Sequence, residues 1–319
     1  MIADRAATED RPAALVCAVV LAHNGARDTL ACLRSLRATT WPSLRTFVVD
    51  NASSDNTAAL VRQHFPEVTL LRSDRNLGYA GGNNLGIARA LEAGCDYLLV
   101  LNNDTLLEPS AVHTLATSAR ERPAVGAVAP LITYLERPEI IWYAGGDYDA
   151  RRGYPGSMRH YRAPVSGVTL SAGPTDRFSG AAVLLKRSVI EQVGGFSEEL
   201  GFLYEDVDLS LRIRAHGWRV WFAPEAVVRH RVAMTQRGEH SPMSFYYGVR
   251  NQLQVAERHA PLGVIAGARR RAVTIAVYLG RARRAGRRGA AIAAVLRGVR
   301  DQRRGRLGYT PPRTPGQQT

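Results

Sequence analysis

The sequence is poor in cysteine and in long apolar runs. Its three cysteines, Cys17, Cys32 and Cys95, are scattered over 319 residues without the spacing of metal ligands. We therefore expect no disulfide framework and a reducing compartment. No run of 18 or more apolar residues occurs, so we expect no conventional membrane-spanning helix. The first residues are charged and contain no apolar stretch, so we also expect no signal peptide.

Acidic residues are scarce in only one part of the chain. Residues 258–319 contain 15 arginines and a single acidic residue, Asp301, whereas residues 1–257 balance 27 basic with 27 acidic residues. The whole net charge of +14 therefore belongs to the C-terminal segment. This distribution indicates a neutral globular body followed by a basic extension. The neutral body gives no support for nucleic-acid binding there.

The body alternates apolar runs with amphipathic segments, which is typical of β–α–β units. Helices are expected near residues 30–36, 57–65, 85–93, 110–120, 188–193 and 209–217. Buried strands are expected at residues 16–22, 46–49, 68–71, 97–101, 125–131, 177–186, 219–222 and 227–230. Residues 132–174 show no clear periodicity and are expected to form irregular or hairpin structure along one wall of a cleft. The order predicts an α/β fold with a mainly parallel sheet flanked by helices.

Two of the expected strands end in aspartate. The apolar run before Asn102-Asn103-Asp104 stops abruptly, and Asp50 follows another buried strand. Ligands of open α/β sheets bind at the carboxyl ends of strands, so both aspartates are candidates for a site. Asp50 could accept a hydrogen bond from N3–H of uracil or thymine. The alternatives are structural: Asp104 could cap a following helix, and Asp50 could form an Asx turn.

A glycine-rich segment follows the third expected strand. Gly78, Gly81 and Gly82 allow close backbone approach or positive φ angles. Their order is G-x-x-G-G, which does not match the dinucleotide fingerprint G-x-G-x-x-G, and no Walker A pattern is present. A nicotinamide or P-loop nucleotide site is therefore not indicated.

Three carboxylates lie at the start of an expected helix, in Glu205-Asp206-Val207-Asp208. Acidic residues there complement the helix dipole, but one of them could also be a general base that faces a cleft. His230 ends an expected strand. It is either a structural histidine or a metal ligand that acts together with Asp104.

The order of these segments carries a resemblance. The run HNG, VVDNAS, NLGYAGGNN, LNND, GGF, EDVD and a final histidine resembles the family-two inverting glycosyltransferases, in particular the rhamnosyltransferase-like group of bacterial surface-polysaccharide enzymes. The resemblance covers residues 14–255. It implies a GT-A fold and a nucleoside-diphosphate sugar as donor.

The resemblance also implies roles for individual residues. Asp206 matches the general base, and Asp104 and His230 match the ligands of a divalent metal, Mg²⁺ or Mn²⁺. The residues implied at the donor nucleotide are Asp50, Asn51, Arg75, Asn76, Gly82, Asn102 and Asn103. Contacts with the donor sugar or the acceptor are implied for Gly180, Ala181, Glu205 and Trp221. The sequence departs from the family at its D-x-D motif, which here reads Asn-Asn-Asp and offers the metal one carboxylate.

The implied reaction moves rhamnose or a similar hexose from a dTDP- or UDP-linked donor to a hydroxyl of a glycan or polyprenyl-linked acceptor, in cell-surface polysaccharide synthesis. With one base and no covalent nucleophile, a single displacement would invert the anomeric centre. A sugar-nucleotide nucleotidyltransferase is a rival, but the His23-Asn24-Gly25 turn lacks the glycine-rich basic loop that such an enzyme needs. A non-catalytic glycan- or nucleic-acid-binding protein that uses the basic tail is the other alternative.

The basic extension shows helical periodicity. Ile292, Val295, Leu296 and Val299 follow the i, i+3, i+4, i+7 spacing, with arginines between and beyond them. Such helices suit an anionic membrane surface, but they could also pack on the body or bind RNA. We expect peripheral membrane contact through residues 258–308 on the cytoplasmic face. The expected layout is a disordered segment 1–13, a catalytic domain 14–257 with a donor half (14–130) and an acceptor half (131–257), the extension 258–308 and a disordered tail 309–319.

Overall fold

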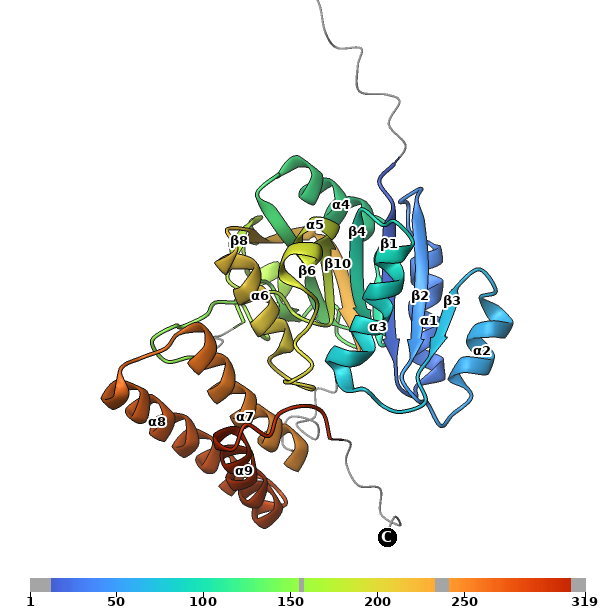
Figure 1. Cartoon of the computed structure of the whole chain (residues 1–319). Coiled ribbons are helices and arrows are strands. Elements are labelled where there is room, and N and C mark those ends of the chain that lie inside the picture. The colour runs from blue at the N-terminus through green and yellow to red at the C-terminus, as the bar shows by residue number, and fades with distance from the viewer. Residues whose placement is uncertain (1–12, 155–157, 233–240, 311–319) are drawn as a thin grey trace, which may run out of the picture.

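The computed structural model describes residues 13–154, 158–232 and 241–310. Figure 1 shows a single twisted sheet with helices on both faces, and a group of three helices below it. Most of the expected disordered segment 1–13 and residues 311–319 of the expected tail lie outside the described residues.

Ten strands of the described chain form this sheet, in the order β3-β2-β1-β4-β9-β6-β10-β5, with β7 beside β6 and β8 beside β10. The strands are β1 (Val16–Ala22), β2 (Leu44–Asp50), β3 (Thr69–Arg72), β4 (Tyr97–Asn102), β5 (Thr105–Leu107), β6 (Val125–Tyr134), β7 (Ile141–Tyr143), β8 (Gly173–Thr175), β9 (Ala182–Lys186) and β10 (Arg219–His230).

The first half of the sheet is parallel, and the second half is mixed. Strands β1, β2, β3 and β4 pair in parallel, and β10 is parallel to β6, as the β–α–β pattern predicts. Strand β9 runs antiparallel between β4 and β6. The mainly parallel α/β fold is therefore confirmed.

Strand register determines which residues meet at one edge of the sheet. Asp50 of β2 lies opposite Ala22 of β1, and Asn102 of β4 lies opposite Leu21. Because β9 is antiparallel, its first residue, Ala182, lies opposite Leu101. The carboxyl ends of β2 and β4 and the beginning of β9 therefore share one edge.

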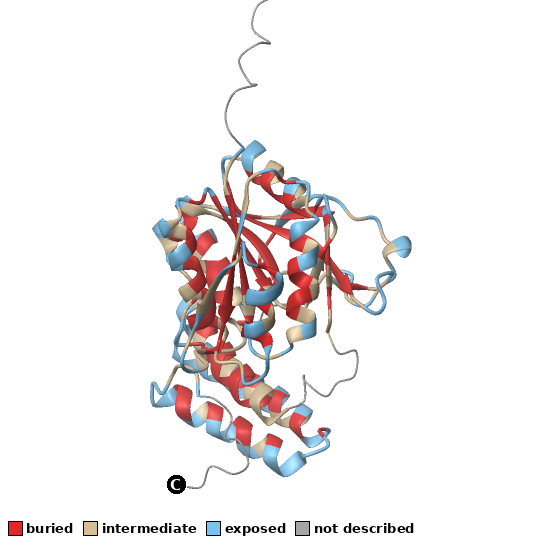
Figure 2. Cartoon of the chain, turned by 90° about the vertical axis from the view of Figure 1, so that its right-hand side faces the viewer, coloured by how far each residue is buried: buried red, intermediate tan, exposed pale blue. Residues whose placement is uncertain are grey.

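The helices cover both faces of the sheet or form the C-terminal group. They are α1 (Ala26–Arg37), α2 (Thr57–His64), α3 (Gly78–Glu92), α4 (Ala111–Glu121), α5 (Arg187–Val193), α6 (Glu205–Ala215), α7 (Pro242–His259), α8 (Val264–Arg283) and α9 (Arg288–Arg303), with a 3-10 turn at Val165–Gly167. Figure 2 shows that the buried residues concentrate in the sheet and on the helix faces that pack on it.

The helix expected near residues 85–93 begins earlier, at Gly78, so that the glycine-rich segment forms the first part of α3. A Cβ atom on Gly82 would lie 2.4 Å from Cδ1 of Leu21, and one on Gly86 would lie 2.3 Å from Cγ1 of Val19. These glycines let the helix backbone approach β1 closely, and tertiary packing here overrides their low helix propensity. Two strands expected at residues 219–222 and 227–230 are one strand, β10, interrupted by an irregularity between Ala223 and Val227.

The C-terminal helices have an apolar core of their own. Helix α7 packs along α9, and α8 contacts both. Their buried residues form a cluster separate from the sheet core, namely Phe245, Tyr246, Tyr247, Val249, Leu253, Tyr278, Ala282, Ala285, Ala291, Ala294 and Val295. Tyr309 and Thr310, the first residues of the expected disordered tail, lie against Tyr247. Among the residues described, no helix combines the length and the apolar character that a membrane crossing requires.

Candidate functional site

Asp50 is the last residue of β2, and its carboxylate pairs with Arg72. Its side chain is completely buried, with Oδ2 3.0 Å from Nε of Arg72 and Oδ1 accepting a hydrogen bond from the backbone N–H of Ser53 at 2.9 Å. The bond to Ser53 spans three residues, one more than in the expected Asx turn, but it is a local structural bond of the same kind. A nucleobase would reach the carboxylate only if Arg72, whose side chain is 49% exposed, moved aside.

Asn51 holds the segment that joins β3 to α3. Its Nδ2 donates to Oδ1 of Asn76 at 3.2 Å and to the carbonyl of Gly78 at 3.0 Å, while its Oδ1 accepts from the N–H of Leu77 at 2.8 Å. A Cβ on Gly82 would lie 3.0 Å from Nδ2 of Asn51. These contacts of Asn51, Asn76 and Gly82 stabilise the segment between β3 and α3. Arg75 lies on the same segment and is exposed.

The Asn-Asn-Asp segment forms a tight corner after β4. The carbonyl of Asn102 accepts from Oγ1 of Thr105 at 2.7 Å, and its N–H donates to the carbonyl of Ala181 at 3.0 Å. Asn103 donates from Nδ2 to Oγ1 of Thr29 at 2.9 Å and to the carbonyl of Asn24 at 3.2 Å. These bonds fix the corner against α1, so that Asp104 points away from it.

Asp104 and His230 come together, although they are far apart in the sequence. Oδ1 of Asp104 lies 3.0 Å from Nε2 of His230, yet within the described part of the chain this buried oxygen accepts no well-oriented hydrogen bond. Trp142 packs edge-on against the imidazole, with the ring centroids 4.8 Å apart. A carboxylate oxygen and an imidazole nitrogen that converge without bonding each other fit the ligand preference of Mn²⁺ or Mg²⁺.

This pair would supply only part of a coordination shell. The part of the chain that the structure describes holds no group of three or more His, Cys, Asp or Glu side chains suited to a metal ion. Six-coordinate ions would need their remaining ligands from a substrate or from water, which is usual where a metal binds together with phosphate groups. Asp104 and His230 therefore fit a metal ion that binds together with a substrate.

Asp206 lies at the start of α6 and is tied to the same edge of the sheet. Its Oδ2 accepts from the N–H of Gly180 at 3.0 Å, and its Oδ1 accepts from the N–H of Val207 at 2.8 Å. The hydroxyl of Tyr79 donates to the carbonyl of Gly180. Because Ala181, the residue after Gly180, bonds to Asn102, the general-base candidate is connected to the corner that leads to Asp104.

The two residues before α6 have unusual backbone conformations. Leu203 and Tyr204 have φ angles of 66° and 73°, in the left-handed region that non-glycine residues rarely adopt. Such conformations cost of order 1–3 kcal/mol each and persist only where the surrounding structure imposes them. The turn they form directs the first residues of α6, including Asp206, toward the edge of the sheet.

Glu205 differs sharply from its neighbour Asp206. Burial, together with the nearby charges of Asp206 and Asp208, raises the pKa of Glu205 to about 8. Its Oε2 is buried and has no hydrogen-bond partner among the residues that the structure describes. A carboxyl group in this environment is protonated at neutral pH.

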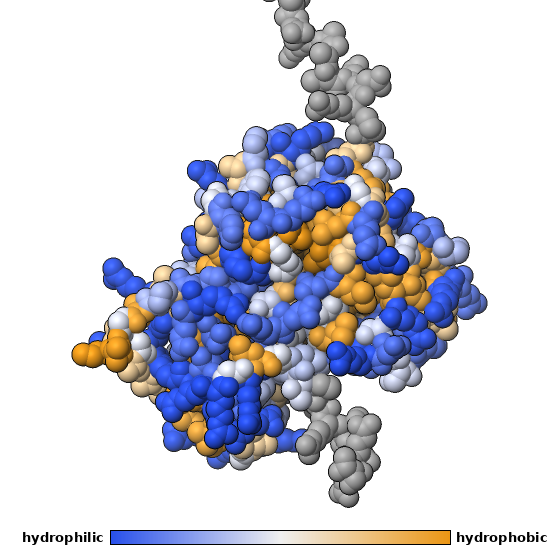
Figure 3. Space-filling model, viewed as in Figure 1, coloured by the Kyte–Doolittle hydropathy of each residue, from blue (hydrophilic) through white to orange (hydrophobic). Residues whose placement is uncertain are grey.

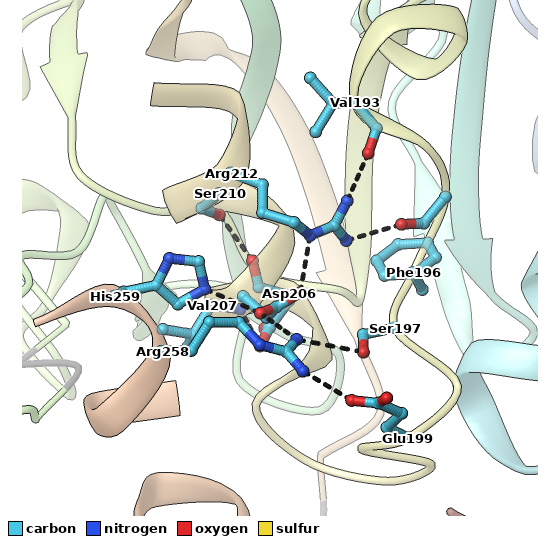
Figure 4. A network of polar contacts seen from close by, with 12 residues as sticks. Val193, Phe196, Ser197, Glu199, Asp206, Val207, Ser210, Arg212, Arg258 and His259 are labelled. Carbon is cyan, nitrogen blue, oxygen red and sulfur yellow. Dashed lines mark hydrogen bonds and ion pairs between the residues drawn. The ribbon is translucent and has the colours of Figure 1, made fainter. Parts of the chain in front are cut away.

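Asp208 anchors α6 to α7. Its buried carboxylate meets Nε of Arg212 at 2.8 Å, Nη1 of Arg258 at 3.0 Å and Nε2 of His259 at 2.8 Å. Figure 4 shows these three side chains converging from two helices. Burial alone would raise the pKa of Asp208, but the hydrogen bond from His259 and the charge of Arg212 outweigh it and lower the pKa to about 2.

Trp221 is not brought to this edge. It pairs with Val128 in the body of the sheet, nine residues before His230 along β10, and the guanidinium of Arg122 lies 4.8 Å above its ring. Conversely, sequence reasoning missed Arg72, Trp142 and Tyr79, which contact Asp50, His230 and Gly180. Of these three residues, only Arg72 could have been found from the sequence, because parallel pairing of β2 with β3 places it opposite Asp50.

The protonated state of Glu205 makes stability depend on pH. The unfolded chain releases this proton near pH 4.5 and the folded chain near pH 8, so the free energy of unfolding should fall as pH rises between these values. In Glu205→Gln the side chain stays neutral, and urea titrations from pH 5 to 8 should show a smaller fall than wild type. Glu92→Gln, at an exposed surface pair, is the control and should retain the wild-type slope. Equal slopes for Glu205→Gln and wild type would contradict the assignment.

Comparison with known sequences supports the resemblance. A sequence profile described as Glycosyl transferase family 2 matches residues 17–191. An N-acetylglucosaminyl-diphospho-decaprenol L-rhamnosyltransferase of Mycobacterium tuberculosis is 30% identical over 253 residues, which cover 72% of this chain and 80% of that protein. The O-antigen biosynthesis protein RfbC of Myxococcus xanthus is 30% identical over 221 residues, 66% of this chain and 17% of that protein.

Comparison with solved structures supports the fold. A mannosyltransferase from Pyrobaculum calidifontis in complex with GDP-Man and Mn²⁺ superposes with a TM-score of 0.55 at 18% identity, covering 90% of this chain and 88% of that one. At this identity the likeness concerns the GT-A fold alone. Together with the profile match and the order of the motifs, it shows that the chain belongs to glycosyl transferase family 2.

Proposed function

We propose that this glycosyltransferase moves rhamnose or a similar hexose from a dTDP- or UDP-linked donor to a hydroxyl of a polyprenyl-linked glycan, with inversion of the anomeric centre. The observation that carries the proposal is the connection of Asp206, through Gly180 and Ala181, to the corner that presents Asp104 to His230. A base candidate and a metal-binding pair thus share one edge of the sheet. The mycobacterial rhamnosyltransferase supports the choice of sugar and of a lipid-linked acceptor.

In the proposed reaction, Asp206 accepts the proton of the acceptor hydroxyl as its oxygen attacks the anomeric carbon. The N–H groups of Gly180 and Val207 hold the carboxylate in place and leave it partly exposed. Because Glu205 is protonated at neutral pH, it adds no second negative charge beside the base. A divalent metal held by Asp104 and His230 would neutralise the charge that develops on the leaving diphosphate.

The donor nucleotide is assigned to the surface above Asp50 and Arg72. If Arg72 moves aside, Asp50 can accept a hydrogen bond from a nucleobase and keep its bond to Ser53, because a carboxylate has two oxygens that accept. Arg75 is exposed on the neighbouring segment, where a guanidinium can bind a phosphate group. Asn51, Asn76 and Gly82 support this segment, and we assign them to its shape rather than to contact with the donor.

The role of Asp206 predicts a selective loss of activity. Asp206→Asn keeps the size of the side chain but removes the proton acceptor, so transfer from nucleotide sugar to acceptor should fall by at least about 10²-fold, within the usual range for a general base. Donor binding, measured as a shift in melting temperature, should remain near wild type. The control Glu92→Gln should retain full activity. Loss of donor binding in Asp206→Asn, or unchanged transfer, would contradict the assigned role.

The metal pair predicts a nucleotide-dependent stabilisation. A ligand that binds only the folded state raises the melting temperature by mass action. We expect UDP or dTDP to raise it more in the presence of Mn²⁺ than in its absence, and Asp104→Ala to abolish the added effect of the metal. A panel with UDP, dTDP, GDP and their sugars would also identify the base. Absence of any shift across the panel would favour the non-catalytic binding protein.

Membrane contact through residues 258–308 is part of the proposal. Val264 and Ile265, at the start of α8, are 90% and 87% exposed. Figure 3 shows an apolar patch at the outer tip of the C-terminal helices. At 100° per residue, Ile265, Arg269 and Val273 share the face opposite buried Thr274 and Tyr278. An apolar face with arginines and no acidic residue along the helix suits an anionic lipid surface, where a polyprenyl-linked acceptor would also lie.

If this face of α8 contacts a membrane, the protein should bind vesicles of anionic lipid. The full-length protein should float with vesicles that contain phosphatidylglycerol and much less with pure phosphatidylcholine. The double variant Ile265→Glu, Val273→Glu should lose most of this binding. The control Ala59→Glu, Ala88→Glu adds the same charge at exposed positions of α2 and α3 and should still bind. Equal binding of both double variants would refute the assigned face.

A further inference from the structure

The residues after α9 return to the catalytic body as a short strap, residues 305–310. The N–H of Gly308 donates to the carbonyl of Glu199, and the carbonyl of Gly308 accepts from Nη1 of Arg250 at 2.9 Å. The N–H of Thr310 donates to the hydroxyl of Tyr247 at 2.7 Å. Both ends of the strap are thus bonded, one to the segment before α6 and the other to α7.

Tyr309 occupies the space that two glycines leave open. A Cβ on Gly78 would lie 2.6 Å from Cγ of Tyr309, and a Cβ on Gly201 would lie 2.8 Å from Cα of Tyr309. Both glycines have positive φ angles, 73° and 69°, which L side chains rarely adopt. On its other side, the Tyr309 ring stacks on Tyr247, with the ring centroids 6.1 Å apart. The backbone conformation on both sides therefore makes room for this one side chain.

The two glycines belong to the two segments that the proposed reaction must bring together. Gly78 follows Arg75 and Asn76 on the donor side, and Gly201 precedes the turn that presents Asp206. The segments are bonded directly, because the N–H of Tyr79 donates to the carbonyl of Gly201 at 2.9 Å. Tyr309 therefore covers the junction between the donor side and the base side.

Two side chains of α7 bond to the backbone of the base-side segment. The guanidinium of Arg250, 1% exposed, donates to the carbonyls of Glu199 and Leu200 and lies 4.6 Å from the ring centroid of Tyr247. Nδ2 of Asn251 donates to the carbonyls of Leu200, Phe202 and Leu203. The backbone that leads into Asp206 is therefore held between α7 and the strap.

The strap also lines an open groove of about 700 Å³. The other residues that line this groove are Arg75, Asn76, Leu77, Glu198 and Glu199. The C-terminal residues thus take part in the surface next to the donor-side segment, more than 200 residues away in the sequence.

We infer that Tyr309 is a positioning residue that holds the donor-side segment 75–78 and the base-side segment 199–204 in the arrangement that catalysis needs. This inference rests on the proposed function for the identity of the two sides. Displacement of one reacting group by about 1 Å can cost about 10²-fold in rate, so a clamp at the junction influences transfer without touching the reacting atoms. A side chain that only stabilised the fold would instead lower the melting temperature and leave the kinetic constants of the folded enzyme unchanged.

The test compares Tyr309→Ala with Tyr309→Phe in the full-length protein. The hydroxyl of Tyr309 has no hydrogen bond within the described part of the chain, so Tyr309→Phe should retain wild-type kinetics. Tyr309→Ala should raise the KM for the nucleotide sugar, lower kcat, and reduce kcat/KM by at least about tenfold at a temperature where it is fully folded. The control Arg306→Ala, an exposed residue of the same strap, should behave as wild type.

Amide hydrogen exchange gives a second readout that needs no activity. Exchange at the N–H of Tyr79, which bonds across the junction to Gly201, should accelerate in Tyr309→Ala and remain at the wild-type rate in Tyr309→Phe and Arg306→Ala. Unchanged exchange in Tyr309→Ala overturns the inference. Faster exchange with unchanged kinetic constants in an active enzyme overturns it as well. A wild-type protein that transfers no sugar instead refutes the proposed function, while exchange at Tyr79 still reports on the clamp.

Discussion

The ion cluster around Asp208 fixes the position of α6 against α7. A fully buried carboxylate is costly unless it is paired, and here Arg212 of α6 and Arg258 and His259 of α7 supply the partners. Breaking such a buried pair typically costs about 3–5 kcal/mol. Because the pKa of Asp208 is lowered to about 2, this stabilisation is present above about pH 4 and is lost as pH falls toward 2. The start of α6, and with it Asp206, therefore depends on α7.

Three carboxylates within four residues have three different environments. Asp208 is ionised because cations surround it, and Glu205 is protonated because it is buried beside two other carboxylates. Asp206 is partly exposed, with two backbone N–H groups on its oxygens. An acidic first turn would favour the helix dipole in any case. The dipole alone does not explain why one of the three is paired, one neutral and one directed to the edge of the sheet. Tertiary contacts made by α7 and by Gly180 produce that difference.

The sequence predicted the sheet well because buried parallel strands are apolar on both faces and end in recognisable polar residues, as in β1 and β4. The order of the motifs also led to the family and to the pairing of Asp104 with His230, which lie 3.0 Å apart. The start of α3 was placed too late because the helical packing of its glycines depends on Leu21 and Val19. Trp221 was misplaced because its role was taken from the family pattern alone. The strap was missed because an isolated tyrosine after a basic helix has no periodicity.

The C-terminal helices α7, α8 and α9 have one side that packs on the body and another that is exposed. Residues that face inward, among them Arg250 and Tyr247, bond or stack against the base-side segment and the strap. Residues that face outward on α8 leave arginines and valines exposed. Helix α7 contacts both α6 and α8. Packing on the body and the proposed contact with a membrane are therefore compatible, because they would use opposite sides of these helices.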